Sequence, residues 1–495
     1  MRKTAAALIL GIALMSNAFA QQSKDTGASV AFTSNDPVIK KALALVNDGK
    51  FSEAQAILAS DDGHSDANVA RAREEMLDVI GRLRREYSLD EAGLLEKIKK
   101  QVSDATAADL KKWRDAGEVQ YRVIDGKVMY FRREPSNIFR FSADAKSRMK
   151  KSSGGEAQPG WRLTDHLKEV VSQAESTGKT DVCPLTHRVE YSISVPTSSL
   201  TGKTGSLARI WLPFPQEYRQ QKDVKLISET LNGEKYEPQI APNASPQRTA
   251  YFEQKITDAS KPIEAKIVFE YTSFAYYLQL DDARVRPLPA DFDRTYLSVR
   301  PPHIAFTPQI KDLVAKIVDG ESNPLARVRK IYHWIDANVR YHAEEEYCVI
   351  PSFATACLSR HKGDCGIQST LFITMCRAAG VPARWQSGWE TKPVGWTMHD
   401  WAEIYIAPWG WVPCDMSYGV QKSEDPKIAD FYIGHQDSHR MIVNLDYGRE
   451  LIPPKNSLRS EPADFQRGEV EIDGKNLYFD EWDYDIKIWI DGKQI

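Results

Sequence analysis

The pattern of hydrophobic and polar residues changes its period along the chain, and each change predicts a different kind of element. Over residues 21–155 the apolar positions recur at helical spacing, which is typical of amphipathic helices. Asp36 and Pro37 provide a capping side chain and a first-turn proline for the first helix. We therefore predict a mainly helical accessory region here. It contains one β-hairpin, at Asp125-Gly126, where apolar and polar residues alternate on both sides.

From about residue 187 the period becomes two. Apolar residues alternate with polar ones over 189–195, 210–212 and 267–271, which predicts short strands separated by turns. We interpret residues 160–300 as a β-sandwich-like domain. The stretch 151–160 before it contains adjacent glycines and a proline, so it is the best candidate for a linker.

The helical period returns in the next region. Asn323-Pro324 opens a predicted helix with one apolar stripe, and we assign residues 301–420 to an α+β core. Residues 421–495 return to alternation around Asp473-Gly474, which predicts a β-hairpin C-terminal extension. The fold class expected for the whole chain is multidomain α+β.

Composition and net charge exclude several classes of structure and function. Charged residues make up 27% and hydrophobic residues 42% of the 495 positions, which is typical of globular proteins and excludes fibrous or wholly disordered classes. Lys and Arg number 65 against 68 for Asp and Glu, a net charge of -3, so no nucleic-acid partner is expected. The sequence indicates no oligomeric state.

The first twenty residues resemble a secretory signal. Arg2 and Lys3 precede an apolar run, and Ala18-Phe19-Ala20 fits the small-x-small cleavage pattern. We predict a signal peptide over 1–20, cleaved after Ala20, and a secreted or periplasmic mature protein. The apolar run is shorter than the roughly 20 residues of a membrane-spanning helix, and no later segment is expected to act as a transmembrane anchor.

A candidate nucleophile lies in the stretch from His361 to Gly366. Cys365 is predicted in the first turn of a helix capped by Asp364, where the helix dipole favours a thiolate. Gly363 and Gly366 leave space for a substrate backbone to approach. A buried, inert cysteine that happens to begin a helix is the alternative.

A thiol nucleophile needs a base, and His399 begins a predicted strand. The next strand brings Asp415, whose carboxylate is able to orient the imidazole. A simple hairpin turning at residues 408–410 places Asp415 opposite Glu403, about four residues or ~13 Å of strand away from His399. A bulge, a strong twist or a different strand pairing must close this gap. Glu403 is a rival orienting residue, but it is better explained as a residue that supports the site, and Asp415 is preferred.

These blocks resemble the catalytic core of the transglutaminase-like superfamily, whose fold is a variant of the papain-like thiol proteases. The similarity covers about 300–420 and rests on four blocks in order, at 363–366, 379–384, 399–403 and 410–415. It implies that Cys365 is the nucleophile, His399 the general base and acid, and Asp415 the residue that fixes the histidine tautomer. No metal and no cofactor are implied.

The chemistry expected from this resemblance is a thioester acyl-enzyme formed from a peptide or protein substrate. The backbone N–H of Cys365 is one expected oxyanion donor, with Tyr341 or Trp334 as candidates for a second. Hydrolysis of peptide or amide bonds is preferred. Protein-glutamine gamma-glutamyltransferase activity and a non-catalytic peptide- or glycan-binding protein are the alternatives. Trp389, Trp396 and Trp401 are candidates to line a substrate groove.

Five of the six cysteines lie between Cys348 and Cys414. Because a catalytic Cys365 must be free, we expect at most two disulfides, with Cys348–Cys357 the favoured pair. A zinc site made of Cys357, His361, Cys365 and Cys376 is disfavoured, since the spacing is not that of common zinc modules. The acidic residues 480–485 are better explained as a solvated strand edge than as a calcium site.

Overall fold

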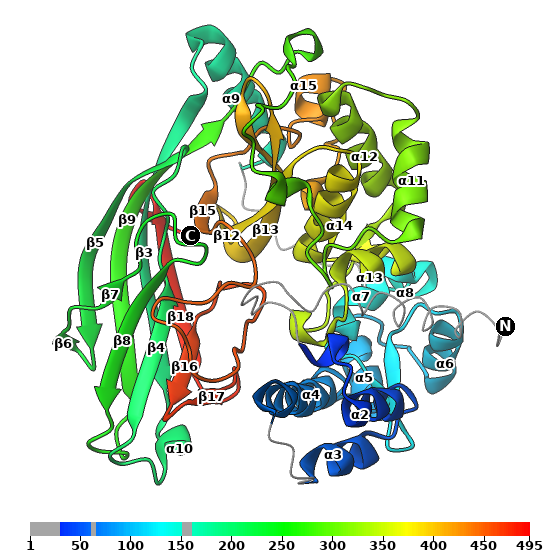
Figure 1. The fold of residues 1–495 in the computed structure, drawn as a ribbon, viewed down its shortest axis with the longest axis vertical. Helices are drawn as coiled ribbons and strands as arrows, with labels where there is room; N and C mark the ends of the chain where they lie inside the picture. Colours follow the sequence, from blue (N-terminus) through cyan, green and yellow to red (C-terminus); the bar gives the residue numbers. More distant parts are fainter. Residues whose placement is uncertain (1–29, 61–65, 151–160) are drawn as a thin grey trace. The chain divides into compact units, whose positions relative to one another are not determined.

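The computed structural model describes residues 30–60, 66–150 and 161–495, and the chain divides into two compact units (Figure 1). One unit is the N-terminal part up to Ser153 with the segment His342–Pro351, and the other holds the remaining residues. The predicted signal peptide and linker lie outside the described residues. Within the described ranges no helix is long and apolar enough to cross a membrane.

The first unit is mainly helical, as the sequence predicts. Asp36 caps the first α-helix by accepting hydrogen bonds from the N–H groups of Val38 and Ile39, which are among the donors that a helix start leaves unpaired. Its core gathers apolar side chains such as Leu94, Leu110 and Trp113. The elements are α2 (Pro37–Asn47), α3 (Phe51–Ala59), α4 (Ala67–Glu86), α5 (Glu91–Lys99), α6 (Ala107–Asp115), β1 (Tyr121–Ile124), β2 (Lys127–Tyr130), α7 (Glu134–Phe141) and α8 (Ala143–Ser147).

The segment His342–Pro351 belongs to this helical unit, although it lies inside the region predicted as the core at 301–420. The amide of Asn137 donates to the carbonyl of Ala343 at 3.0 Å, and the hydroxyl of Tyr87 donates to Glu345 at 2.7 Å. Glu345 is buried, so the hydroxyl of Tyr87 takes the place of water that its carboxylate would otherwise bind. Hydrophobic periodicity does not indicate that this segment belongs to the helical unit, because polar side chains make the contacts.

In the second unit, two antiparallel sheets pack against one hydrophobic core (Figure 1). The predicted alternating runs lie in the long strands β3, β4 and β9, whose inward-facing residues fill that core. The elements are α9 (Leu163–Thr177), β3 (Asp181–Val195), α10 (Thr197–Leu200), β4 (Leu207–Pro213), β5 (Gln221–Leu231), β6 (Glu234–Lys235), β7 (Gln239–Ile240), β8 (Thr249–Lys255) and β9 (Ile263–Tyr276).

The C-terminal strands do not form an extension of their own, which differs from the predicted boundary at 421. Strands β16 (Glu469–Ile472) and β17 (Lys475–Leu477) join β4 in one sheet, and β18 (Asp483–Ile490) and β19 (Lys493–Gln494) join β3 in the other. The predicted hairpin at Asp473-Gly474 is present, with Ile472 paired to Lys475. Sequence order hides this arrangement because strand pairing is a long-range property.

The second unit also contains a four-stranded sheet in the order β14-β13-β12-β15, covered by helices on one face (Figure 1). Helix α14 packs on β13 and β12, while Trp389 and Met441 from the sheet join the core of the two larger sheets. The elements are α11 (Pro308–Val318), α12 (Pro324–Asn338), β10 (Arg340–Tyr341), α13 (Phe353–Arg360), β11 (Lys362–Gly363), α14 (Cys365–Ala378), β12 (Ala383–Lys392), β13 (Gly395–Ile406), β14 (Gly410–Cys414), α15 (Pro426–Ala429) and β15 (Arg440–Asn444).

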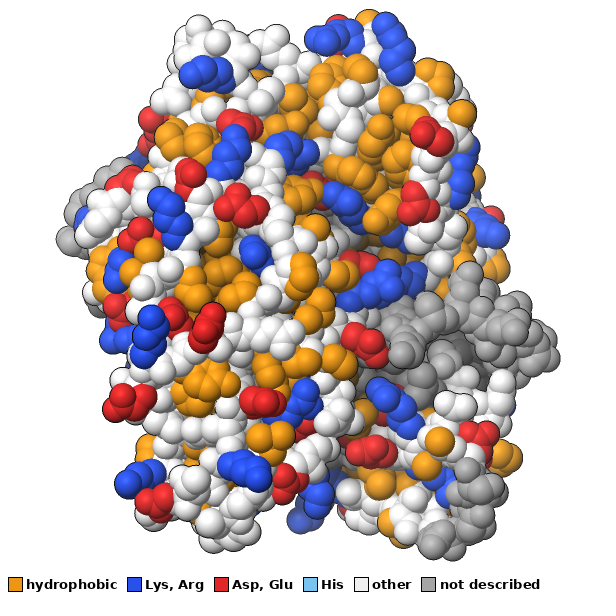
Figure 2. All heavy atoms as spheres, turned by 60° about the vertical axis from the view of Figure 1, so that its left-hand side comes forward, with side chains coloured by type: hydrophobic (Ala, Val, Ile, Leu, Met, Phe, Trp, Pro, Cys, Tyr) orange, Lys and Arg blue, Asp and Glu red, His pale blue; other side chains and the backbone are white. Residues whose placement is uncertain are grey.

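The surface agrees with the balanced composition. On the face shown in Figure 2, basic and acidic side chains are interspersed, and no large area of its described residues carries a single sign of charge.

Candidate active site

Cys365 is the first residue of α14, as predicted, and the carboxylate of Asp364 accepts the N–H of Ile367 at 3.2 Å. Gly363 lies in β11, two residues before the thiol, and pairs with Tyr341 of β10. A Cβ atom on Gly363 would lie 2.7 Å from the side chain of Ile367. The space at Gly363 is therefore used for packing within the protein, a different role from the substrate access that we expected there.

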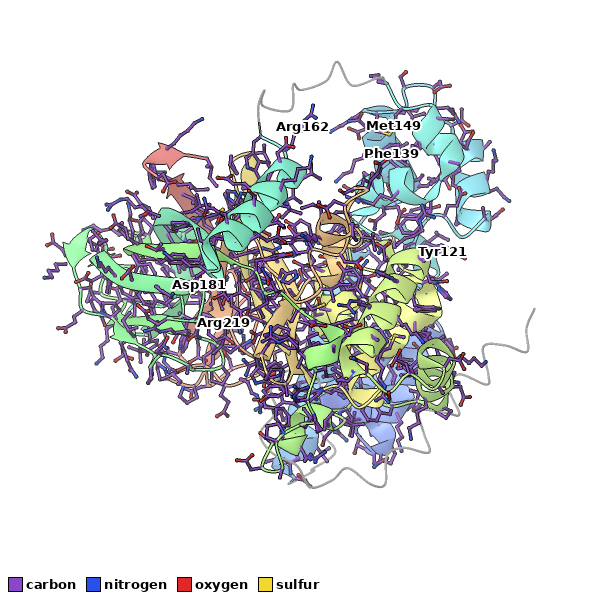
Figure 3. The ribbon with its side chains drawn as sticks, turned by 90° about the horizontal axis from the view of Figure 1, so that it is seen from above. Tyr121, Phe139, Met149, Arg162, Asp181 and Arg219 are labelled. Atoms are coloured by element: carbon purple, nitrogen blue, oxygen red, sulfur yellow. The ribbon has the colours of Figure 1, made fainter. Side chains whose placement is uncertain are left out.

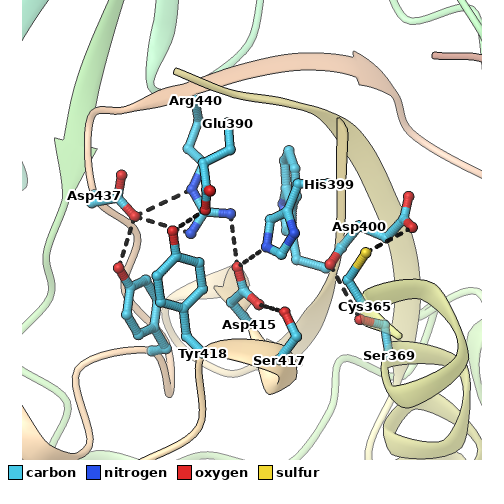
Figure 4. A network of polar contacts seen from close by, with 12 residues as sticks. Cys365, Ser369, Glu390, His399, Asp400, Asp415, Ser417, Tyr418, Asp437 and Arg440 are labelled. Carbon is cyan, nitrogen blue, oxygen red and sulfur yellow. Dashed lines mark hydrogen bonds and ion pairs between the residues drawn. The ribbon is translucent and has the colours of Figure 1, made fainter. Parts of the chain in front are cut away.

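The thiol of Cys365 lies against a second carboxylate. Its sulfur is 3.3 Å from Oδ2 of Asp400, which follows His399 in β13 (Figure 4). Burial, together with the charges of Asp400 and Asp364, raises the pKa of the Cys365 thiol well above its usual range. In this arrangement burial and the two carboxylates favour the protonated thiol.

His399 and Asp415 contact each other directly. Nε2 of His399 is 2.7 Å from Oδ2 of Asp415, and both side chains are buried (Figure 4). Burial acts to lower the pKa of His399, but the charge and hydrogen bond of Asp415 outweigh it and raise that pKa. Burial acts to raise the pKa of Asp415, which His399 and Arg440 nevertheless lower. The pair is therefore a charge-stabilised hydrogen bond.

The observed strand register explains how the predicted gap closes. Ile406 pairs with Gly410, so the turn is formed by residues 407–409 and Glu403 faces Pro413. A simple hairpin would pair Glu403 with Asp415. The observed register differs from it by two residues, and this different pairing brings Asp415 toward His399 along the strand. The sequence does not define the turn closely enough, because Pro408 and Gly410 are both acceptable turn residues.

Glu403 belongs to a different network and does not orient His399. It is fully buried and accepts hydrogen bonds from the hydroxyl of Tyr218 at 2.8 Å and from Arg384 at 2.7 Å. Arg219, labelled in Figure 3, adds a third contact at 3.2 Å from the loop before β5. Burial acts to raise the pKa of Glu403, but the two arginines and the tyrosine lower it. Its carboxylate is thus a structural anion that ties β13 to the larger sheets.

Residues that surround the site were missed in the sequence, among them Arg440 and Gln466. Arg440 begins β15 and contacts Oδ2 of Asp415 at 2.7 Å, and Gln466 donates to the carbonyl of His399 at 3.0 Å and to Oδ1 of Asp400 at 2.9 Å. The signal for Arg440 is a basic residue that opens the apolar run 441–443, a position where an unpaired charge would be unfavourable. Gln466 lies in an irregular segment with no comparable signal.

The other predicted residues lie at varied positions. Tyr341 is 41% exposed on β10, and Trp334 of α12 is partly buried near the ring of His361. Trp389 and Trp401 are fully buried, with their indole N–H groups bonded to the carbonyl of Gln466 and the side chain of Gln386. Among the three candidate groove tryptophans, Trp396 alone has an exposed part.

All six cysteines lie in the described ranges, and none of them forms a disulfide there. The expected disulfide between Cys348 and Cys357 is therefore wrong in this structure. Cys348 lies in the segment that belongs to the helical unit, whereas Cys357 lies on α13 of the other unit, and no pattern in the sequence indicates that division. In the described part of the chain, no group of three or more His, Cys, Asp or Glu side chains is arranged to hold a metal ion.

Comparison with known proteins finds a family match for the part of the chain that contains Cys365 and His399. Residues 311–416 match the family model of the transglutaminase-like superfamily. An uncharacterized protein of Haemophilus influenzae is 26% identical over 307 residues, which cover 53% of this chain and 79% of the relative.

Two solved structures are similar to parts of the chain. A candidate cysteine protease from Cytophaga hutchinsonii has a TM-score of 0.41 and 14% identity, covering 63% of this chain and 91% of the other. The periplasmic domain of TgpA from Pseudomonas aeruginosa has a TM-score of 0.25 and 15% identity, covering 52% and 94%.

Proposed function

Because residues 311–416 form a transglutaminase-like domain, we propose that this chain is a cysteine-dependent enzyme that cleaves peptide or amide bonds. Cys365, His399 and Asp415 are its catalytic residues. The observation that carries the proposal is the 2.7 Å contact between Nε2 of His399 and Asp415, on the strand that packs against the helix begun by Cys365.

The tautomer of His399 follows from this contact. Nε2 carries the proton that Asp415 accepts, so Nδ1 is the nitrogen left to exchange a proton with the thiol. The sulfur of Cys365 must leave Asp400 and transfer its proton to Nδ1, which produces a thiolate beside an imidazolium. Asp415 stabilises the positive ring that results.

The thiolate then attacks the carbonyl carbon of the substrate, and a tetrahedral oxyanion forms. The backbone N–H of Cys365 is one of the unpaired donors at the start of α14 and suits this oxyanion. The C–N bond breaks as the imidazolium gives its proton to the leaving amine, which leaves a thioester on Cys365. Water attacks the thioester, His399 accepts the proton of that water, and the thiol and a carboxylate are released.

Acyl transfer to an amine is the second candidate. Cys365 as a residue is only 9% exposed, and the rings of Trp401 and Tyr418 lie beside His399. A dry site slows hydrolysis of the thioester. Incubation with a glutamine-bearing protein and a fluorescent primary amine separates the two reactions. We expect new peptide termini without label. Label incorporation that depends on Cys365 would instead identify a transferase.

A non-catalytic peptide- or glycan-binding protein is the remaining alternative. It would bind peptides without creating new termini, and Cys365→Ala would leave that binding unchanged. Isothermal titration of the wild type and of Cys365→Ala with the same set of synthetic peptides makes the comparison.

We also propose that the mature chain is exported. The support is the signal-like sequence before Gln21. Expression in a bacterial host, followed by N-terminal sequencing of the periplasmic fraction, tests this directly. A mature N-terminus at Gln21 is expected, and full-length protein confined to the cytoplasm would contradict export.

A further inference from the structure

We propose that Arg440, together with Asp437, is a positioning residue that sets the proton affinity of His399 through Asp415. Arg440 lies outside residues 311–416, so the matched domain does not contain it. The inference rests on the proposed function, in which His399 exchanges a proton with Cys365. It adds to that function the ion pair of Arg440 with Asp437, which changes the proton affinity of His399.

The geometry centres on one oxygen atom. Oδ2 of Asp415 is 2.7 Å from Nε2 of His399 and 2.7 Å from Nη1 of Arg440 (Figure 4). The guanidinium and the imidazole therefore share the negative charge of the same carboxylate oxygen. Because the guanidinium is permanently charged, it withdraws part of the attraction that a protonated His399 would otherwise receive.

Arg440 has no freedom to leave this position. Its Nη2 and Nε atoms are 3.0 and 3.2 Å from Oδ2 of Asp437, and the side chain is 1% exposed. The rings of Tyr418, Trp401 and Tyr432 surround the guanidinium, with centroids at 4.8, 5.3 and 5.7 Å. Such a cage of aromatic faces stabilises a cation and excludes water.

Asp437 is fixed in its turn. Its carboxylate accepts a hydrogen bond from the hydroxyl of Tyr432 at 2.9 Å and from the backbone N–H of His439 at 2.9 Å. The four groups then alternate in sign along a buried line: Asp437, Arg440, Asp415 and protonated His399. Each charge weakens the effect of its neighbour on the next group.

The sign of each contribution to His399 follows from this order. A buried histidine and aspartate alone would hold a proton tightly and make a poor base near neutral pH. The positive charge of Arg440 opposes protonation of His399, and the negative charge of Asp437 partly cancels Arg440. The proton affinity of His399 is therefore a balance between two carboxylates and one guanidinium.

Other charged and titratable groups near His399 come from every element packed around it. On β12, Glu390 accepts a hydrogen bond from Tyr418 and lies 3.1 Å from Lys392, and its charge favours protonation of His399. Among these groups, only Arg440 and Asp437 reach His399 through Asp415. The set is Glu390, Lys392, Asp400, Asp415, Tyr418, Asp437, Arg440 and the thiol of Cys365.

Two substitutions of opposite sign test the proposal. Arg440→Met removes the positive charge, so the midpoint of the His399 titration should rise by about one pH unit. Asp437→Asn keeps the shape but strengthens the effect of Arg440, so the midpoint should fall. The measurement is an NMR titration of the imidazole Cε1–H signal, assigned to His399 with His399→Gln and recorded on the full chain.

Two further variants serve as controls. Arg440→Lys keeps the charge and should restore the wild-type midpoint to within a few tenths of a unit. Arg384→Met removes an arginine that is paired with Glu403 on the same sheet, and it should leave the His399 titration unchanged. If Arg440→Met does not fold, the nearly isosteric Asp437→Asn still gives a signed answer.

The possible outcomes separate this inference from the proposed function. Shifts of the same sign in Arg440→Met and Asp437→Asn, or no shift in either, would overturn the inference even if the wild type cleaves peptides. Opposite shifts in a protein that cleaves nothing would support the ion-pair balance while contradicting the proposed function. A purely structural role for Arg440 predicts lower stability without a signed change in the His399 titration.

Discussion

The sulfur of Cys365 lies 3.3 Å from Oδ2 of Asp400, and Gln466 holds the other oxygen of that carboxylate at 2.9 Å. The proposed nucleophile, Cys365, thus lies against the carboxylate of Asp400. The proposed base, His399, precedes Asp400 in the chain and is paired with Asp415. A negative carboxylate beside a thiol favours the protonated form of the thiol. This contact therefore describes Cys365 before it is converted to the reactive thiolate.

Removal of the charge on Asp400 is expected to activate the thiol. In Asp400→Asn, the pKa of Cys365 should fall and its alkylation by iodoacetamide at pH 7 should accelerate several-fold, because only the thiolate reacts. Peptide mapping by mass spectrometry gives the rate for each cysteine. Asp364→Asn is the matched control and should give a smaller acceleration, since Asp364 is the weaker of the two charges and asparagine also caps helices. Slower alkylation in Asp400→Asn would contradict this account.

The pair of His399 and Asp415 should make stability depend on pH with a defined sign. The pKa of His399 is raised in the folded state, so its contribution is fully present below the unfolded value of about 6.5 and disappears as the pH rises through the folded pKa. The difference in melting temperature between wild type and His399→Gln should therefore shrink between pH 6 and pH 9. A difference that grows over this range would show that the sign is wrong. Tryptophan fluorescence is a suitable probe.

Glu403 should matter for stability more than for chemistry. Glu403→Gln leaves Arg384 and Arg219 without their buried anion, and loss of one partner of such a pair costs about 3–5 kcal/mol. Urea unfolding measures the loss. The control Glu190→Gln removes a partly exposed partner of Lys266, for which about 1 kcal/mol or less is expected. Equal losses in the two variants would contradict the role of Glu403 as a buried anchor.

Gly388 tests the packing beneath the site. A Cβ atom there would overlap the carbonyl oxygen of Met441 on the neighbouring strand β15, so Gly388→Ala should separate β12 from β15 and lower the melting temperature markedly. The control is Gly81→Ala in α4, where no atom lies within 4 Å of the new methyl group and helix propensity predicts a gain of about 0.5–1 kcal/mol. A stable Gly388→Ala protein with an intact site would disagree with the observed strand pairing.

The extent of prediction from sequence differs among these residues for physical reasons. Asp364 and Cys365 were placed correctly because a helix start is encoded locally by its capping residue and the apolar spacing that follows. Asp415 was named, but the pairing that brings it to His399 stayed open, because a two-residue shift in a turn changes the whole register. Arg440, Asp437 and Gln466 were missed, since their partners are remote in sequence and charged residues are usually exposed.

The central claim is that Cys365 forms a thioester with its substrate. The direct measurement is the digestion of a peptide library with hydroxylamine present, analysed by mass spectrometry for new carboxylate and hydroxamate termini. Wild type and Cys376→Ala, which loses a buried thiol of the same helix, should produce both kinds of terminus, and Cys365→Ala should produce neither. Cleavage that persists in Cys365→Ala, or a wild-type digest without hydroxamates, would contradict the thioester mechanism.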